Sequence, residues 1–296
     1  IEVNMKILVL ASGGDAPGMN RFMWEIYRKF KDNVYFAFAG FTGLVNGQIF
    51  PLSEVIDSSK KNSAGVVTKA SRCPEFKQAK YFNMGLEYAK KFDAVIILGG
   101  NGSEKGAKRL FENGVNTIFV PGTIDNDVED CHYSIGFSTA VKEAVYSVEN
   151  TMPSIDAFLN ACLFEVMGRE DDSICKEVAK QVDADYQVVD EKTLDYEKMK
   201  NVILKKYIAS SSAKIIVREN IANITEIASK LNEMLGMNIV KTQIVGRTQR
   251  GGSPTKQELS MATKFAKETI RCIKTKVFGV RVLADENLNI IVTEFK

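Results

Sequence analysis

The chain has 296 residues, 45% hydrophobic and 26% charged, with a mean hydropathy of -0.10, which predicts a soluble globular protein of about two domains and excludes a disordered or fibrous chain. Lys and Arg number 39 and Asp and Glu number 37, so the net charge is only +2. This balance gives no bulk electrostatic reason to expect nucleic acid or an anionic membrane as a partner, although a local basic pocket is compatible with it.

Short apolar runs rich in Val, Ile and Phe alternate along the chain with longer stretches of helical character. This alternation predicts an α/β fold with parallel sheets. The expected strands span residues 6–11, 34–39, 94–98, 117–120, 161–166, 186–189, 214–217 and 240–245. The expected helices span residues 21–31, 77–91, 104–113, 138–151, 173–183, 195–209, 224–235 and 256–274.

The cysteines and the apolar runs indicate where the protein resides. The five cysteines include no CxxC pair, and the single histidine, His132, predicts no His/Cys metal cluster. The apolar runs are far shorter than the roughly 20 residues that cross a bilayer, and no secretory leader is recognisable. We therefore expect a cytoplasmic protein with reduced thiols and no membrane association.

Three of the expected strands run into Gly-rich or Asp-rich loops. These loops are residues 12–20, 99–103 and 121–127. In open α/β sheets ligands bind beyond the carboxyl ends of strands, where backbone N–H groups and helix N-termini favour anions. One such loop alone is equally compatible with a tight turn before a capped helix. Three of them in one half of the chain predict an anion-binding site.

The residue types in these loops indicate phosphate chemistry. Glycines at positions 13, 14, 99, 100 and 102 allow a backbone to approach a phosphate closely, in a pattern that is neither a P-loop nor GxGxxG. Asp125 and Asp127, two residues apart, point the same way if the segment is extended. One carboxylate would accept a proton from a substrate hydroxyl and the other would help hold Mg²⁺. The candidate phosphate partners are Arg72, Arg169, Arg250, Arg247 and Lys241.

Five motifs resemble the ATP-dependent 6-phosphofructokinase family. They are residues 12–20, 122–127, 135–140, 165–169 and 249–254, in the order and spacing of that family. The resemblance implies two doubly wound parallel-sheet α/β domains. Residues 1–136 with 249–296 would bind the nucleotide, and residues 137–248 would bind the sugar phosphate. It also implies a homotetramer whose active sites are completed by a neighbouring subunit.

The resemblance implies an activity and a role for each matching residue. The activity is Mg²⁺-dependent transfer of phosphate from ATP to the 1-hydroxyl of fructose 6-phosphate, a step of glycolysis. Asp125 would be the base, with Thr123 beside it, while Gly14, Arg72 and Arg169 would stabilise the transferring phosphoryl group. ATP would contact Gly14, Arg72, Cys73, Gly102 and Ser103. The sugar phosphate would contact Thr123, Asp125, Asp127, Met167, Gly168, Arg169, Glu219, Lys241, Arg247 and Arg250. Asn101 and Asp127 would lie at the metal, and Gly102 and Gly122 match ATP-using rather than pyrophosphate-using members.

Four positions depart from the family pattern and leave two hypotheses open. Asn101 stands in place of a metal-binding Asp, Asn160 and Lys241 in place of arginines that reach a neighbouring subunit's sugar phosphate, and Arg247 in place of a His. The first hypothesis is a working phosphofructokinase with weakened contacts. The second is a catalytically degenerate paralogue that binds nucleotide or a partner subunit, in a homotetramer or a mixed oligomer.

Overall fold

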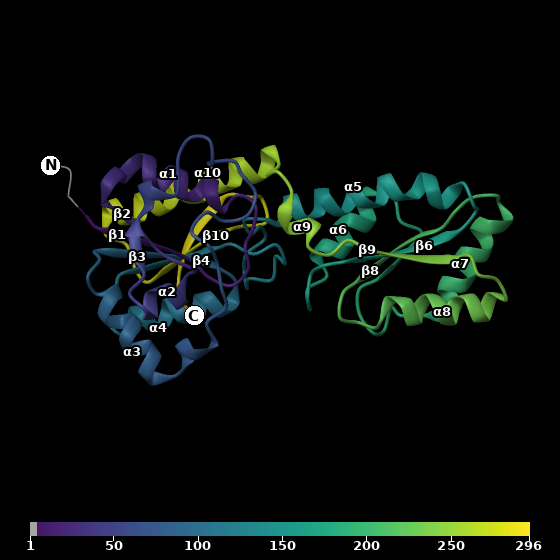
Figure 1. The fold of residues 1–296 in the computed structure, drawn as a ribbon, viewed down its shortest axis with the longest axis horizontal. Helices are drawn as coiled ribbons and strands as arrows, with labels where there is room; N and C mark the ends of the chain where they lie inside the picture. The colour runs from purple at the N-terminus through teal and green to yellow at the C-terminus, as the bar shows by residue number, and fades with distance from the viewer. Residues whose placement is uncertain (1–4) are drawn as a thin grey trace. The chain divides into compact units, whose positions relative to one another are not determined.

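Figure 1 shows a computed structural model of the chain, in which residues 5–296 are described. The chain divides into two compact units. Unit 1 consists of Ile1–Thr139 and Ser253–Lys296, and unit 2 of Ala140–Gly252. The chain therefore leaves unit 1, builds unit 2, and returns to unit 1. Among the described residues, no helix is long and apolar enough to cross a membrane.

Unit 1 is built on a seven-stranded sheet with the strand order β11-β10-β5-β4-β1-β2-β3. The five inner strands are parallel, whereas β3 and β11 at the two edges pair antiparallel with their neighbours. The strands are β1 (Ile7–Ala11), β2 (Val34–Ala37), β3 (Ile49–Pro51), β4 (Ala94–Gly99), β5 (Thr117–Pro121), β10 (Val280–Ala284) and β11 (Ile290–Glu294). Every residue of β1, β4 and β5 is buried, as expected for parallel strands covered on both faces.

Helices cover both faces of this sheet (Figure 1). On one face α1 (Met19–Phe30) packs against α10 (Lys256–Thr275), and on the other lie α2 (Phe41–Val45), α3 (Ala79–Ala89) and α4 (Asn101–Glu112). The buried positions of α1, Met19, Phe22, Met23 and Ile26, recur at the spacing of one helix face. Three short 3₁₀ helices, Lys31–Asn33, Leu52–Glu54 and Pro74–Lys77, complete the unit.

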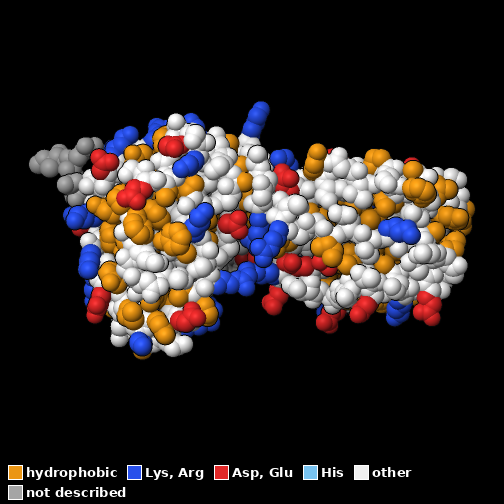
Figure 2. All heavy atoms as spheres, viewed as in Figure 1, with side chains coloured by type: hydrophobic (Ala, Val, Ile, Leu, Met, Phe, Trp, Pro, Cys, Tyr) orange, Lys and Arg blue, Asp and Glu red, His pale blue; other side chains and the backbone are white. Residues whose placement is uncertain are grey.

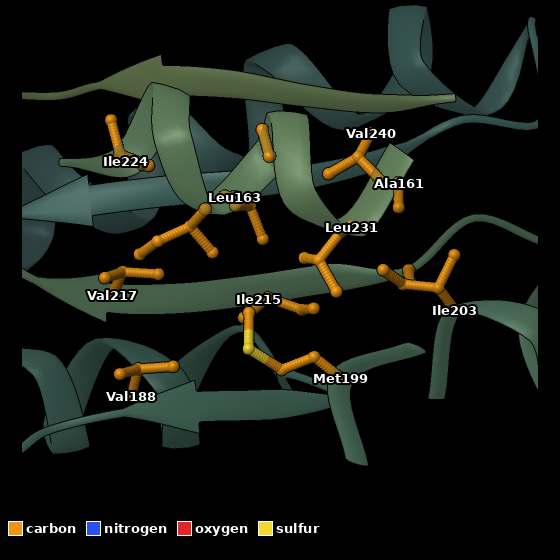
Figure 3. Close-up of a cluster of buried hydrophobic side chains, with 13 residues drawn as sticks. Ala161, Leu163, Val188, Met199, Ile203, Ile215, Val217, Ile224, Leu231 and Val240 are labelled. Atoms are coloured by element: carbon orange, nitrogen blue, oxygen red, sulfur yellow. The ribbon is translucent and has the colours of Figure 1, made fainter. Parts of the chain in front are cut away.

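Unit 2 has a four-stranded parallel sheet with the order β7-β8-β6-β9. Its strands are β6 (Ala161–Val166), β7 (Tyr186–Val188), β8 (Lys214–Arg218) and β9 (Val240–Ile244). Its helices are α6 (Ser173–Gln181), α7 (Tyr196–Ile208), α8 (Ile224–Leu235), α9 (Thr248–Gly251) and most of α5 (Phe137–Asp156). Figure 3 shows part of its core, in which Leu163 and Ile215 of the sheet lie against Met199 of α7 and Leu231 of α8.

The predicted fold class is confirmed. All eight expected strands and all eight expected helices are present within a few residues of their predicted bounds. The sequence pattern did not predict α2, α9 or the strands β3, β10 and β11. β3 and β11 are partly exposed edge strands, whereas β10 is fully buried and contains an arginine within its apolar run.

The strand order places the three Gly-rich or Asp-rich loops side by side. β1, β4 and β5 are neighbours, so the loops that follow them lie at one edge of the sheet. After β1 the chain adds β2 on one side of β1, while β4 and β5 extend the sheet on the other side. This reversal is a topological switch point, where ligands bind in doubly wound folds.

Candidate active site

The loop after β1 is fixed to its neighbours by backbone hydrogen bonds. Ser12 N donates to Leu98 O at 2.9 Å, and Gly13 N donates to Ser71 O at 3.0 Å. Gly13 has φ 95°, a left-handed value that L residues rarely adopt. These bonds bring the segment of Arg72 and Cys73 beside the loop that holds Gly14. Arg72 is exposed and Cys73 is half-buried.

The first turn of α4 carries the second loop. Ser103 is buried, and its hydroxyl donates to Ser12 O at 3.1 Å, which ties α4 to the loop after β1. A Cβ at Gly99 would lie 2.3 Å from Ser103 Oγ, so only glycine allows this approach. A Cβ at Gly102, in contrast, would meet no atom within 4 Å. The N-terminus of a helix three turns long therefore opens onto free space at Gly102, an arrangement that favours phosphate.

The loop after β5 holds a buried carboxylate. Asp125 is only 1% exposed, and its backbone N–H donates to Thr123 Oγ1 at 3.2 Å. The next residue, Asn126, has φ 58°, and its Oδ1 accepts hydrogen bonds from Ser134 N at 2.8 Å and Ser134 Oγ at 3.1 Å. The Ser134 hydroxyl is also 2.6 Å from Thr123 O. Ser134 and Asn126 thus fix the conformation of the segment that carries Asp125, roles that the sequence motifs did not assign.

Asn101 and Asp127, the two residues of the predicted metal site, are in contact. The Asn101 amide donates to Asp127 O at 3.0 Å and to Asp127 Oδ2 at 3.2 Å. Among the described residues, no three His, Cys, Asp or Glu side chains are placed to hold a metal by themselves. Mg²⁺ commonly takes one or two protein oxygen ligands and completes its shell with water and substrate phosphates. One carboxylate and one amide oxygen fit that pattern.

A pocket of about 330 Å³ opens beside this pair in unit 1. Its walls carry both charge signs, so the pocket itself is not strongly biased toward an anion or a cation. The lining residues are Asn101, Glu104, Lys105, Lys108, Asp127, Glu129 and Lys296. Basic and acidic side chains are likewise both scattered over the face of unit 1 that Figure 2 shows.

In unit 2 the residues after β6 form a second hydrogen-bonded group. Glu219 Oε1 accepts from Gly168 N at 3.1 Å and from Arg169 N at 2.9 Å. Met167 N donates to Gln249 Oε1 at 2.8 Å. Gln249 is fully buried, and it is a positioning residue that the sequence reasoning missed, although it lies in the same motif as Arg250. The structure therefore brings Met167, Gly168, Arg169 and Glu219 together at the carboxyl ends of β6 and β8.

The backbone at this group is unusual, and its carboxylates influence each other. Gly168 has φ 147° and Arg169 has φ 52°, and the Arg169 carbonyl accepts a hydrogen bond from Arg218 Nη1. Burial, and to a smaller extent the negative charge of Glu219, raise the pKa of Glu165 above its ordinary value. A basic partner would relieve this excess of negative charge.

The remaining predicted residues of unit 2 lie at different places. Arg247 immediately precedes the short α9 and is exposed, whereas Arg250 lies within α9 and is half-buried. Lys241 pairs with Cys162 near the beginning of β6, at the opposite end of the sheet from Met167, Gly168 and Arg169. Its ammonium donates to Asn238 O at 3.0 Å. Asn160 immediately precedes β6, at the same end as Lys241. Within one chain, Lys241 and Asn160 are therefore not part of the group around Arg169.

Comparison with known proteins identifies the family. Residues 6–273 match the family model described as phosphofructokinase. The chain belongs to the phosphofructokinase family. It is 34% identical over 94% of its length to an ATP-dependent 6-phosphofructokinase of Lactococcus lactis, of which 83% is covered. It is 33% identical over 97% of its length to one of Coxiella burnetii, of which 90% is covered.

Solved structures share the fold of this family member. A phosphofructokinase of Pichia pastoris in the T-state matches with a TM-score of 0.85 at 23% identity, over 100% of this chain. The match covers 35% of the Pichia pastoris chain, so this chain spans about a third of that protein's length. A pyrophosphate-dependent phosphofructokinase of Nitrosospira multiformis matches with a TM-score of 0.85 at 15% identity, over 98% of this chain and 82% of the other.

Proposed function

We propose that this protein is an ATP-dependent 6-phosphofructokinase, a kinase that transfers the γ-phosphoryl group of ATP to the 1-hydroxyl of fructose 6-phosphate in glycolysis. The observation that carries the proposal is the buried Asp125 carboxylate, which lies in a loop hydrogen-bonded to Gly99 just before the open N-terminus of α4. The names of the relatives, which are 33–34% identical, support the same reaction. They do not favour the alternative of a degenerate paralogue.

The residues of unit 1 bind the nucleotide and move the proton. Asp125 accepts the proton of the sugar 1-hydroxyl as its oxygen attacks, and Thr123 holds the Asp125 segment through its side-chain hydrogen bond. The amide of Gly14 and the positive charges of Arg72 and Arg169 stabilise the transferring phosphoryl group. The nucleotide phosphates lie against the N–H groups at the start of α4. The ATP-binding residues we propose are Gly14, Arg72, Cys73, Gly102 and Ser103.

Asn101 and Asp127 hold Mg²⁺ in this proposal. When bound, Mg²⁺ neutralises the charge that develops on the phosphate oxygens. Asp127 contributes the carboxylate, and Asn101 contributes an amide oxygen and fixes Asp127 through its N–H group. Replacement of the family's Asp by Asn101 removes one negative charge, so we expect weak Mg²⁺ affinity rather than none.

ATP is the proposed donor rather than pyrophosphate. Pyrophosphate-using members of the family carry Asp and Lys at the positions of Gly102 and Gly122. A Cβ at Gly122 would lie 2.8 Å from the terminal methyl of the buried Met19, so a lysine there requires that methyl to shift. The free space at Gly102 leaves room for nucleotide phosphates.

Unit 2 binds the sugar phosphate, through Met167, Gly168, Arg169, Glu219, Arg247, Arg250 and Lys241. We propose an oligomer, a homotetramer or a mixed oligomer with a paralogue, in which Lys241 serves a neighbouring subunit. Its distance along the sheet from the group around Arg169 supports this assignment. Apolar side chains also reach the surface of unit 2 (Figure 2), where Phe158 is 74% exposed and Ile208 is 80% exposed. Burial of such side chains in subunit contacts would stabilise an assembly.

We place the protein in the cytoplasm, as its five unpaired cysteines suggest.

A coupled assay with fructose 6-phosphate tests the proposed function. The purified chain should turn over MgATP and should not use pyrophosphate, and light scattering should give the mass of an oligomer. Asp125→Asn is the matched inactive control, because it keeps the size of the side chain and removes the base. Absence of turnover in the wild type, combined with no gain in Asn101→Asp, would instead indicate a degenerate subunit.

A further inference from the structure

Arg281 is a buried charge outside the motifs described above. It lies in β10, one residue after the strand begins, and is 1% exposed. Its Nε forms an ion pair with Glu104 Oε1 at 2.9 Å, and its Nη1 is 3.4 Å from Asp130 Oδ2. Its Nη2 donates a hydrogen bond to the backbone oxygen of Glu129. The charges of Glu104 and Asp130 and the backbone oxygen of Glu129 offset the cost of burying the guanidinium, so its position depends on both acidic side chains.

The partners of Arg281 belong to the two segments that form the proposed metal and nucleotide site. Glu104 is in the first turn of α4, directly after Asn101, Gly102 and Ser103. Glu129 and Asp130 follow Asp127 in the loop after β5. Lys296 reinforces the second segment through ion pairs with Glu129 at 2.9 Å and Asp130 at 2.5 Å. One side chain therefore joins both segments a few residues away from their functional groups.

We propose that Arg281 is a positioning residue for phosphoryl transfer, which fixes the segment of Asp125 and Asp127 against the first turn of α4. This inference rests on the proposed function. Nε of the guanidinium pairs with the Glu104 carboxylate in the first turn of α4. Nη1 and Nη2 contact the Asp130 carboxylate and the Glu129 backbone oxygen in the loop after β5. The guanidinium thereby sets the separation between the proton acceptor and the helix N-terminus that receives the nucleotide phosphates.

A second contact between the segments shows why the anchor matters. The Asn101 amide donates to the backbone oxygen and to Oδ2 of Asp127, at 3.0 and 3.2 Å. These bonds are exposed, and water competes for them, whereas the Arg281 side chain is shielded from water. Loss of Arg281 would leave this pair and the hydrogen bond from Gly122 N to Gly99 O to hold the geometry. The residues that support metal ligands typically change metal affinity or activity by about 10–100-fold when they are mutated.

The test compares Arg281→Gln and Arg281→Lys with Val282→Ala in the full chain. Val282 is the next residue of β10, equally buried on the opposite face of the sheet, so its variant controls for lost stability. In Arg281→Gln we expect faster hydrogen exchange of the amides of residues 122–131 and a half-saturating MgATP concentration raised by about 10–100-fold. The KM for fructose 6-phosphate should change less than the half-saturating MgATP concentration, because most of the proposed sugar-phosphate contacts lie in unit 2, whereas Arg281 contacts unit 1. Arg281→Lys should be intermediate, since it keeps the charge and loses the fork.

The outcomes distinguish the two proposals. The positioning role is wrong if Arg281→Gln and Val282→Ala show the same hydrogen exchange at residues 122–131 and the same half-saturating MgATP concentration. This holds even if both variants turn over substrate. If the wild type binds no MgATP in a calorimetric titration, the proposed function is wrong. Should Arg281→Gln fail to fold, Arg281→Lys and Glu104→Gln decide the question by the same two readouts, and an unchanged result in both overturns the inference.

Discussion

The Asn101 side-chain amide donates hydrogen bonds to both the backbone oxygen and Oδ2 of Asp127, at 3.0 and 3.2 Å. A neutral amide permits this approach, whereas two carboxylates at such a distance repel each other unless a cation lies between them. Because Asn101 is neutral, the pair carries less negative charge for a metal to neutralise than two carboxylates would.

Asn101→Asp is therefore expected to make the site depend more strongly on Mg²⁺. The variant should reach half-maximal turnover at a lower Mg²⁺ concentration, because a second carboxylate joins the ligand set. Without Mg²⁺ its thermal midpoint should fall below that of the wild type, since the introduced carboxylate would face Asp127. Differential scanning fluorimetry with and without Mg²⁺ measures the second effect. Asn101→Ala is the control, and equal Mg²⁺ dependence in all three proteins would contradict the proposed metal site.

Asp125→Asn should abolish most of the turnover and leave nucleotide binding intact. A general base contributes about 10²–10⁴-fold to the rate, and the amide keeps the volume of the buried side chain. The coupled assay measures turnover, and the thermal shift produced by MgATP shows whether binding persists. A variant with the turnover of the wild type would show that another group accepts the proton.

The sequence alone predicted the central strands and the loops after β1, β4 and β5, because apolar runs and glycines are local signals. It did not predict β10, since the positive charge of Arg281 interrupts a run of five residues and its partners in the loop after β5 lie about 150 positions away in the chain. It also did not predict the roles of Ser134 and Gln249. Ordinary polar residues acquire such roles only when folding brings a particular backbone group within hydrogen-bonding distance.

Gly102→Asp should weaken the binding of MgATP. The new carboxylate would stand in the open space at the N-terminus of α4 and repel the phosphates that this end of the helix attracts. Gly102→Ala adds a methyl group alone, in the same free space, and should bind nearly as the wild type does. Isothermal titration with MgATP compares the three proteins. Equal affinity of Gly102→Asp and Gly102→Ala would place the nucleotide phosphates elsewhere.

Glu258 of α10 should make the stability of the protein depend on pH. Its carboxylate accepts hydrogen bonds from Gly136 N at 2.8 Å and Thr139 N at 3.3 Å, and burial raises its pKa from 4.5 to about 7. The folded chain therefore binds more protons than the unfolded chain between these two pH values. Its stabilising contribution is complete below pH 4.5 and is lost as the pH rises through about 7.

Glu258→Gln should remove this dependence. At about pH 5 the free energy of unfolding of the variant should be about 1–3 kcal/mol lower than that of the wild type, because an amide nitrogen cannot accept the N–H bond that one carboxyl oxygen accepts. The difference in unfolding free energy should narrow toward about pH 8. Urea unfolding followed by circular dichroism at both pH values measures it. Glu268→Gln on the same helix is the control, and parallel pH profiles of wild type and Glu258→Gln would disprove the assignment.

The position of β10 in the sheet also constrains the order in which the chain folds during synthesis. β10 pairs with β5 on one side and β11 on the other, yet residues 140–252 of unit 2 are translated before it. Unit 2 is continuous in sequence and can complete its core while the outer edge of β5 is still unpaired. An exposed strand edge of this kind is prone to aggregation. During synthesis, the loop that carries Asp125 and Asp127 can therefore form its contact with Arg281 only after residues 280–284 have been translated.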